Sequence, residues 1–223
     1  MKRKIKACLP ENFTVTAHTG CEKTKDNTID SLIVGCTSGA DIVEFDLNFD
    51  AKGNAVLSHN MPVDGCVTLD EAFCCIAAYE KIKVNVDVKK TDNLKEVEAC
   101  AAKYLLTDRI FYTGIDKEYV PDVKQQTPSV AYYLNVAVER KRRKDIEYLN
   151  MLADLVEQQG AVGINLNKKG CSEELVNVFH KRKLLVSVWT VNKKHEMRKM
   201  LSLLPDNITT RYPSRLTRII KKN

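Results

Sequence analysis

The chain alternates along its length between short β-branched or apolar runs and longer segments with helical periodicity. We expect strands at residues 13–18, 41–49, 83–89, 109–114, 129–135, 162–167, 185–192 and 207–213. Helices are expected at 28–38, 68–79, 93–105, around 116–126, 145–159, 172–182, 194–204 and 214–220. A short run at 54–59 is predicted to pair back on 41–49 as a hairpin. Parallel strands need crossover connections, usually helices, so eight strand–helix units predict a parallel sheet.

Eight such units in 223 residues match the size of a closed (β/α)8 barrel of the TIM type. The alternative is an open, doubly wound sheet, which commonly carries a GxGxxG turn after its first strand. No such turn follows residues 13–18, so the closed barrel is favoured. We expect residues 1–223 to form a single barrel domain.

Charged residues alternate with apolar ones in two of the predicted strands. Glu44 and Asp46 occupy alternate positions in 41–49, and Asp87 and Lys89 do so in 83–89. Successive strand residues face opposite sides of the sheet, and the helices must cover an apolar face, so the charged residues should point into the barrel. Carboxylates buried without partners are costly. At the carboxyl-terminal mouth they can share a cation and reach water, which predicts a functional site there.

The residue types at this mouth indicate a metal site with two proton-transfer groups. Three carboxylates with no nearby cysteine or histidine ligand motif favour Ca²⁺ or Mg²⁺. His18 ends the first predicted strand and His59 ends the hairpin run, and two neutral histidines suit acid and base roles. Lys89 is expected to bind a phosphate oxygen or to neutralise the carboxylates. Each residue alone also has a purely structural interpretation, but their joint placement favours a catalytic site.

Composition and charge argue against a nucleic-acid partner and against stable membrane insertion. The formal net charge is +6, and basic residues concentrate in segments such as 139–144. Such a run is typical of a solvated face, with a phosphate-rich surface or nucleic acid as the less favoured interpretation. No aromatic residue interleaves the run, so no nucleic-acid partner is expected. No stretch has about 18 consecutive apolar residues, so no stable membrane insertion is expected.

Cysteine usage and the start of the chain predict a reducing environment. The first residues are basic but lack the apolar stretch of a signal peptide. The eight cysteines show no CxxC spacing, which argues against a zinc ribbon and favours reduced thiols in the cytoplasm. Cys21 and Cys66 both fall in predicted loops near the site, and a pairing between them is left open. The sequence leaves the oligomeric state undetermined.

Several motifs, in order along the chain, resemble those of the glycerophosphodiester phosphodiesterases. The family typically shows His-Arg-Gly, Glu-Asn-Thr, Glu-x-Asp, His-Asp, Glu-x-Lys, Trp-Thr-Val-Asn and Thr-Asp-x-Pro. The matching stretches here are AHTG (17–20), DNT (26–28), GADIVEFDLNFDAKGNAVLSHN (39–60), VNVDVK (84–89), VWTVN (188–192) and ITTRYP (208–213).

The resemblance implies a phospholipase-C-like (β/α)8 barrel that hydrolyses small glycerophosphodiesters to glycerol 3-phosphate and an alcohol, a reaction of lipid and glycerol metabolism. It implies one divalent cation, Ca²⁺ or Mg²⁺, and specific roles for individual residues. The metal ligands would be Glu44, Asp46 and Asp87, the acid/base pair His18 and His59, the phosphate-side lysine Lys89, and the aromatic wall over the glycerol Trp189. Many relatives insert a cap after the position of His59. Only eight residues lie there in this chain, so we expect no large cap and a more open mouth.

The chain departs from the family pattern at several positions. Thr19 stands in place of an arginine, which removes a bidentate phosphate donor, and Thr19 is itself expected to lie on the phosphate side of the pocket. Asp26 and Asp87 replace glutamates and keep the charge, whereas Asn60 replaces an aspartate. Arg211 stands where the family has an aspartate, and in a closed barrel the last strand lies beside the first. We therefore hypothesise that Arg211 binds the phosphate in the space that Thr19 leaves, the alternative being an arginine that only solvates a helix start.

These departures leave two other functions open. One is a barrel that binds a metal and a phosphate ligand without turnover, and the other is a phosphodiesterase for lysophospholipids or cyclic phosphodiesters. Retention of both histidines and all three carboxylates favours catalysis. Strand parity suggests additional pocket residues, although parity in short strands slips easily; these are Tyr112, Tyr133, Asn165 and Asn167.

Overall fold

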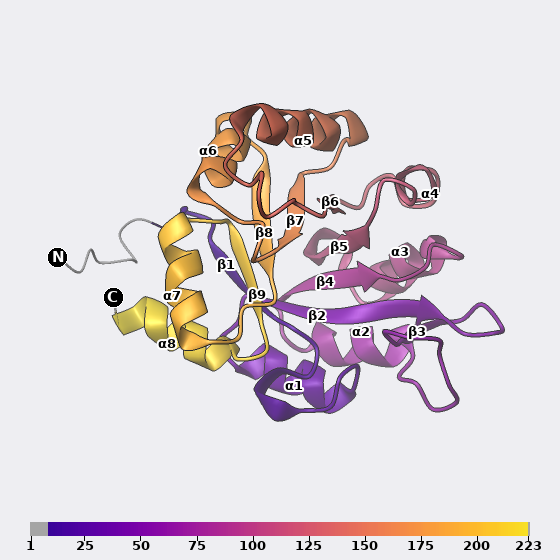
Figure 1. Cartoon of the computed structure of the whole chain (residues 1–223). Coiled ribbons are helices and arrows are strands. Elements are labelled where there is room, and N and C mark those ends of the chain that lie inside the picture. The colour runs from indigo at the N-terminus through magenta and orange to yellow at the C-terminus, as the bar shows by residue number, and fades with distance from the viewer. Residues whose placement is uncertain (1–8, 223) are drawn as a thin grey trace.

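Eight parallel strands form a closed barrel in the structure, a computed structural model that describes residues 9–222 (Figure 1). Neighbouring strands pair in chain order, and β1 pairs with both β2 and β9, which closes the sheet. The barrel strands are β1 (Thr14–Ala17), β2 (Ile42–Phe49), β4 (Lys83–Val88), β5 (Ile110–Ile115), β6 (Tyr132–Asn135), β7 (Gly163–Asn167), β8 (Leu185–Trp189) and β9 (Asn207–Thr210). The predicted (β/α)8 barrel is confirmed.

Helices follow the strands and cover the outside of the barrel (Figure 1). They are α1 (Ile29–Thr37), α2 (Leu69–Ala77), α3 (Leu94–Lys103), α4 (Val120–Gln126), α5 (Ile146–Gln159), α6 (Glu173–Lys181), α7 (Lys194–Leu203) and α8 (Pro213–Lys222), with short 3₁₀ turns η2 (Cys21–Lys23) and η3 (Thr107–Arg109). β6 begins later than expected because the Val130 N–H donates to the Thr127 carbonyl (3.1 Å) in a turn. Within residues 9–222, no helix has the length and apolar character needed to cross a membrane.

The apolar strand residues face outward onto the helices, as the alternation predicts. Val43, Phe45 and Leu47 of β2 are at most 1% exposed. The Phe45 ring meets Phe73 of α2 edge to face, with 6.0 Å between ring centroids. Burial of these side chains provides the main favourable free energy of folding. It also fixes the register that turns the intervening polar residues inward.

A hairpin extends the sheet beyond the barrel and leads back to α2. β3 (Ala55–Leu57) pairs antiparallel with the end of β2 through a turn in which Gly53 has φ 84°. The first turn of α2 is a capping box. The Thr68 hydroxyl accepts from the Glu71 N–H (3.2 Å) and the Glu71 carboxylate accepts from the Thr68 N–H (2.8 Å). Only residues 58–68 separate β3 from α2, so no large cap is inserted there.

Neutral polar side chains fill the amino-terminal end of the barrel interior. The Asn207 amide donates to the hydroxyls of Thr14 (2.9 Å) and Thr16 (2.7 Å). Its carbonyl oxygen accepts from the Ser187 hydroxyl (3.2 Å). These contacts join β1, β8 and β9 at the seam where the barrel closes, and they satisfy the buried polar groups.

The cysteines of the described residues are free thiols, including Cys21 and Cys66. Cys21 is buried, and its thiol donates to the Ser31 carbonyl (3.6 Å). Burial raises the pKa of the Cys21 thiol to about 11, so this thiol is protonated and unreactive at neutral pH.

Candidate active site

A cavity of about 360 Å³ opens at the carboxyl-terminal ends of the barrel strands. Most of the predicted site residues line it: His18, Glu44, Asp46, His59, Asp87, Lys89 and Trp189. Thr19 and Arg211 lie close by but are not among the lining residues. Active sites of TIM barrels lie at this end of the fold, so the position agrees with a catalytic role.

The three predicted carboxylates converge because β2 and β4 are neighbours in register, with Asp46 beside Asp87. One ligand oxygen from each of Glu44, Asp46 and Asp87 lies within 4.8 Å of the other two. Burial raises the pKa of Glu44 to about 7; His18 opposes this shift, and the charges of Asp46 and Asp87 add to it. The protein therefore holds a buried carboxylate whose ionisation needs a nearby positive charge.

Lys89 supplies part of that charge. Its Nζ lies 2.9 Å from Asp46 Oδ1 and also contacts Asp87. Burial disfavours the charged ammonium, but the two carboxylates outweigh burial and raise the pKa of Lys89 above its ordinary value. Lys89 is therefore protonated at neutral pH and offsets one of the three carboxylate charges.

The donor set suits a divalent cation. With Lys89 protonated, ionisation of all three carboxylates would leave two negative charges uncompensated in a small, mostly buried cluster. Oxygen ligands of this kind match hard cations such as Ca²⁺ and Mg²⁺. Within residues 9–222, Glu44, Asp46 and Asp87 form the one cluster of acidic, histidine or cysteine ligands close enough together to hold an ion.

The loop after β1 holds the two β2 carboxylates in place. The Thr19 N–H donates to Glu44 Oε2 (2.7 Å), and the Asn27 amide donates to Asp46 Oδ2 (2.8 Å). Asn27 Oδ1 accepts in return from the Asp46 N–H (3.0 Å), and the Thr19 hydroxyl accepts from the Asn27 N–H (2.6 Å). Thr19 is thus buried against Asn27 and orients the carboxylates through the loop. Its predicted contact with the phosphate stays a prediction.

Both predicted catalytic histidines reach the cavity with a ring nitrogen engaged elsewhere. His18 Nδ1 lies 2.8 Å from the Thr19 carbonyl oxygen, which only accepts hydrogen bonds, so Nδ1 carries the hydrogen and Nε2 is the basic atom. His18 Nδ1 is also 3.8 Å from Glu44 Oε2. His59 is exposed at the rim, with Nδ1 3.2 Å from Asn60 Oδ1. The amide therefore contacts the ring at the position where the resemblance expects a carboxylate.

Arg211 and Asp26 form a bidentate ion pair beside the cavity. The two guanidinium nitrogens lie 2.6 Å and 2.9 Å from the two Asp26 oxygens, and this hydrogen bonding holds the pKa of Asp26 below its ordinary value. Gly20 has φ 70°, and a Cβ there would lie 1.8 Å from Asp26 Oδ1. The pair thus joins the loop after β1 to the end of β9, next to Thr19 as expected. Phosphate binding by Arg211 stays a prediction.

Trp189 ends β8 and lines the cavity, and its indole N–H is buried without a hydrogen-bond partner in the described part of the chain. Asn165 of β7 also lines the cavity, as parity predicts. The prediction was wrong for Tyr112, which is fully buried on the face of β5 opposite Thr113. Tyr133 faces a cavity at the amino-terminal end instead, and Asn167 is exposed outside the lining.

Sequence reasoning missed several polar residues that support the site. Asn27 lies in the DNT stretch (26–28) that matches the family pattern, but only the folded loop shows that it holds Asp46. Asn85 shares the face of Asp87, so the parity that identified Asp87 could have found it. The Thr113 hydroxyl donates to Asp87 Oδ1 (2.7 Å), and the Asn135 side chain accepts from the Gly114 N–H (3.3 Å). The pairing of β5 with β6 is irregular here, so strand alternation does not predict which residues of the two strands lie side by side.

Comparison with known proteins places this barrel in a defined family of phosphoric diester hydrolases. The model of the glycerophosphoryl diester phosphodiesterase family matches residues 74–215, more than half of the chain. The chain belongs to the glycerophosphoryl diester phosphodiesterase family. No curated protein matches it by sequence.

Solved structures agree on the fold. A protein of Silicibacter pomeroyi assigned as a glycerophosphoryl diester phosphodiesterase has a TM-score of 0.81 at 19% identity, covering 94% of this chain and 93% of that one. A phosphodiesterase of Oleispira antarctica, in complex with the product sn-glycerol-3-phosphate, has a TM-score of 0.76 at 18% identity, with 97% and 99% covered. A glycerophosphodiester phosphodiesterase of Parabacteroides distasonis has a TM-score of 0.76 at 16% identity, with 95% and 98% covered.

Proposed function

We propose that this protein hydrolyses small glycerophosphodiesters to glycerol 3-phosphate and an alcohol, using His18 and His59 as its acid/base pair. The observation that carries the proposal is one cavity lined by three converging carboxylates, Lys89 and both histidines. The Oleispira antarctica relative in complex with glycerol 3-phosphate supports this choice of product.

The cation would be held by Glu44, Asp46 and Asp87, and the uncompensated charge of that cluster supports this assignment. When bound, a divalent cation would neutralise negative charge on the phosphodiester. Lys89 adds a fixed positive charge on the same side of the cavity. Trp189 provides the aromatic wall against which the glycerol carbons pack.

The two histidines divide the proton transfers. His18 Nε2 accepts a proton from the attacking water, whose oxygen forms the new bond to phosphorus, because the His18 Nδ1–H is already donated to the Thr19 carbonyl. His59 is at the exposed rim and donates a proton to the oxygen of the departing alcohol as the phosphorus–oxygen bond breaks. Asn60 holds the His59 ring by one hydrogen bond without adding a negative charge.

The test is release of glycerol phosphate from glycerophosphocholine by the whole chain with Ca²⁺ or Mg²⁺. We expect chelator to abolish release, and His18→Ala to slow it by about 10²–10⁴-fold. His195→Ala is the matched control, because His195 is exposed on α7 and outside the cavity lining. Binding of glycerol phosphate without release under either ion would instead identify a barrel that binds but does not turn over.

A further inference from the structure

The segment that brings His59 to the cavity also exposes two apolar side chains. Met61 is 81% exposed and Val63 is 74% exposed. Pro62 stands between them and restricts the backbone, so the two side chains project from a stiffened turn. Single exposed apolar residues are ordinary on protein surfaces. These two lie in the ten-residue segment 58–67 that borders the cavity, and the reaction proposed above gives them no role.

The loop between β6 and α5 carries excess positive charge. Residues 136–145 include five basic and two acidic residues. Arg142 pairs with Asp145 (3.1 Å) and Lys144 with Glu174 (3.2 Å). Arg140 and Lys141 are exposed and have no acidic partner within residues 9–222. This loop therefore presents uncompensated cations to solvent.

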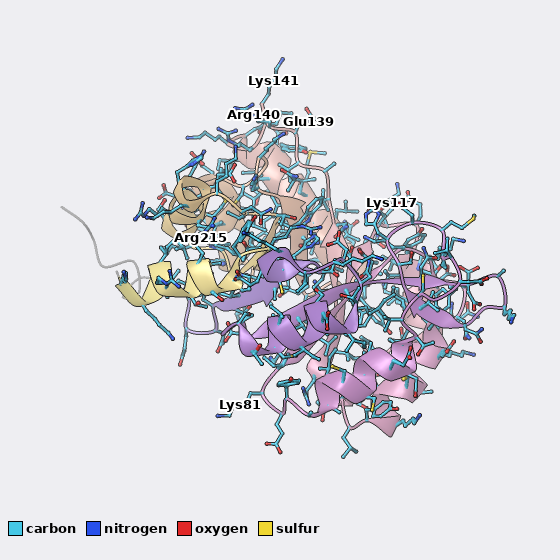
Figure 2. All side chains as sticks on the ribbon, turned by 90° about the horizontal axis from the view of Figure 1, so that it is seen from below. Lys81, Lys117, Glu139, Arg140, Lys141 and Arg215 are labelled. Carbon is cyan, nitrogen blue, oxygen red and sulfur yellow. The ribbon has the colours of Figure 1, made fainter. Side chains whose placement is uncertain are left out.

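The basic loop leaves the carboxyl-terminal end of barrel strand β6, and segment 58–67 carries His59, which lines the cavity, so both segments border the same mouth. Figure 2 shows Arg140 and Lys141 projecting from the top of the molecule, whereas Lys81, which precedes β4, lies at the opposite end. In Figure 1, α5 lies at the top and β3 at the lower right. In the sheet, β5, β4 and β2 lie between β6 and β3, so the basic loop and the apolar turn lie at different parts of the barrel rim.

We propose that this face docks on the surface of an anionic lipid bilayer, with the cavity opening toward the headgroups. Arg140 and Lys141 attract the anionic lipids, each basic residue strengthening binding about fivefold. Met61 and Val63 enter the boundary between headgroups and acyl chains. The acidic Asp64 beside Val63 limits insertion to these two tips. Docking requires no membrane-spanning helix.

A bilayer fits the pair of features better than nucleic acid does. Single-stranded nucleic acid is usually held by aromatic residues interleaved with basic ones, and residues 136–145 contain no aromatic residue. Exposed apolar tips beside basic residues match an interface that is charged at its surface and apolar beneath. Because the mouth has no inserted cap, a docked molecule would take diesters presented at that surface, an extension that rests on the proposed function.

The test is cosedimentation of the full chain with vesicles of phosphatidylcholine, alone or containing phosphatidylglycerol, at low salt. We expect binding to the anionic vesicles that weakens as salt is added. Arg140→Glu with Lys141→Glu should weaken this binding about 25-fold or more. Met61→Ser with Val63→Ser should weaken it about tenfold.

Matched controls lie at the opposite end of the barrel. Lys81→Glu removes an exposed lysine, and Leu105→Ser removes a leucine that is 87% exposed, and neither should change vesicle binding. All four variants should hydrolyse soluble glycerophosphocholine at the wild-type rate. Vesicle binding without turnover would contradict only the proposed function, and turnover without vesicle binding would contradict only the docking.

Three results would overturn the docking. One is absence of vesicle binding at low salt, and another is equal binding to vesicles with and without phosphatidylglycerol. The third is binding to single-stranded DNA that is as tight as binding to anionic vesicles, together with no change in either binding when Met61 and Val63 are replaced by serine. That outcome would assign the basic loop to a soluble polyanion.

Discussion

At the amino-terminal end of the barrel interior, the Asn207 amide finds hydroxyl partners on β1 and β8, and no ionised side chain takes part. At the carboxyl-terminal end, Glu44, Asp46 and Asp87 are packed within 4.8 Å with one ammonium among them. The first arrangement satisfies its own hydrogen bonds and stabilises the fold. The second leaves negative charge unbalanced, a cost that a bound cation would offset. Polar residues inside one barrel thus serve stability at one end and chemistry at the other.

The largest effect is expected from a substitution in the acidic cluster at the mouth. Glu44→Gln keeps the shape and the acceptor for the Thr19 N–H but removes a metal ligand, so glycerophosphodiester turnover should fall about a thousandfold. In chelator, the same change should raise the free energy of unfolding by about 1–2 kcal/mol, because it removes a buried charge beside two others. Initial rates and urea unfolding, with and without chelator, measure the two effects. A variant that loses both activity and stability in chelator would contradict the assignment.

A substitution at the amino-terminal end of the barrel should instead lower stability and leave turnover nearly unchanged. Asn207→Leu keeps the branched shape of the side chain, although leucine is larger, and leaves the Thr14 and Thr16 hydroxyls without their donor, so the free energy of unfolding should fall by about 2–3 kcal/mol. Turnover at saturating substrate should stay within about twofold of wild type, since Asn207 lies outside the mouth cavity. Urea unfolding measures the change in the free energy of unfolding, and initial rates measure turnover. A large loss of turnover in folded protein would show that the two ends are coupled.

A smaller effect is expected from Arg211→Ala, which tests whether Arg211 binds the phosphate or stabilises the fold through Asp26. If Arg211 binds the phosphate, KM for glycerophosphocholine should rise about tenfold or more with little loss of stability. If its function is the pair with Asp26, the free energy of unfolding should fall by about 1 kcal/mol with KM unchanged. Unchanged turnover and affinity would reject the phosphate role.

The Asp26–Arg211 pair also has a predictable pH dependence. Because Arg211 lowers the pKa of Asp26 in the folded chain, the pair's contribution to stability is fully present above the ordinary aspartate pKa. It is lost as the pH falls through the lowered pKa. The stability difference between wild type and Arg211→Ala should therefore be largest near neutral pH and shrink in acid.

Much of the fold and the acidic cluster could be predicted because each rests on short-range periodicity. Alternation of valine and phenylalanine with Glu44, Asp46 and Asp87 indicates both which face the helices cover and which residues lie inside. The Thr68–Glu71 capping box is equally local and equally readable. Tyr112 was misplaced because a parity one residue out of register reverses every side chain; in the sheet Tyr112 pairs with outward-facing Val86, and Thr113 pairs with Asp87. The family model begins at residue 74, so the motifs around His18, Glu44 and His59 had to be identified from their own residues.

By itself, the sequence determined the closed barrel, the inward carboxylates and the mouth to which they belong, because strand alternation and strand–helix order are local properties of the chain. Only the tertiary structure decided what each side chain contacts. Asn27 holds Asp46 from nineteen residues away, and Arg211 meets Asp26 across the closure of the barrel. The pairing of β1 with β2 brings Asn27 to Asp46, and the β1–β9 seam brings Arg211 to Asp26; the spacing of these residues along the chain indicates neither contact.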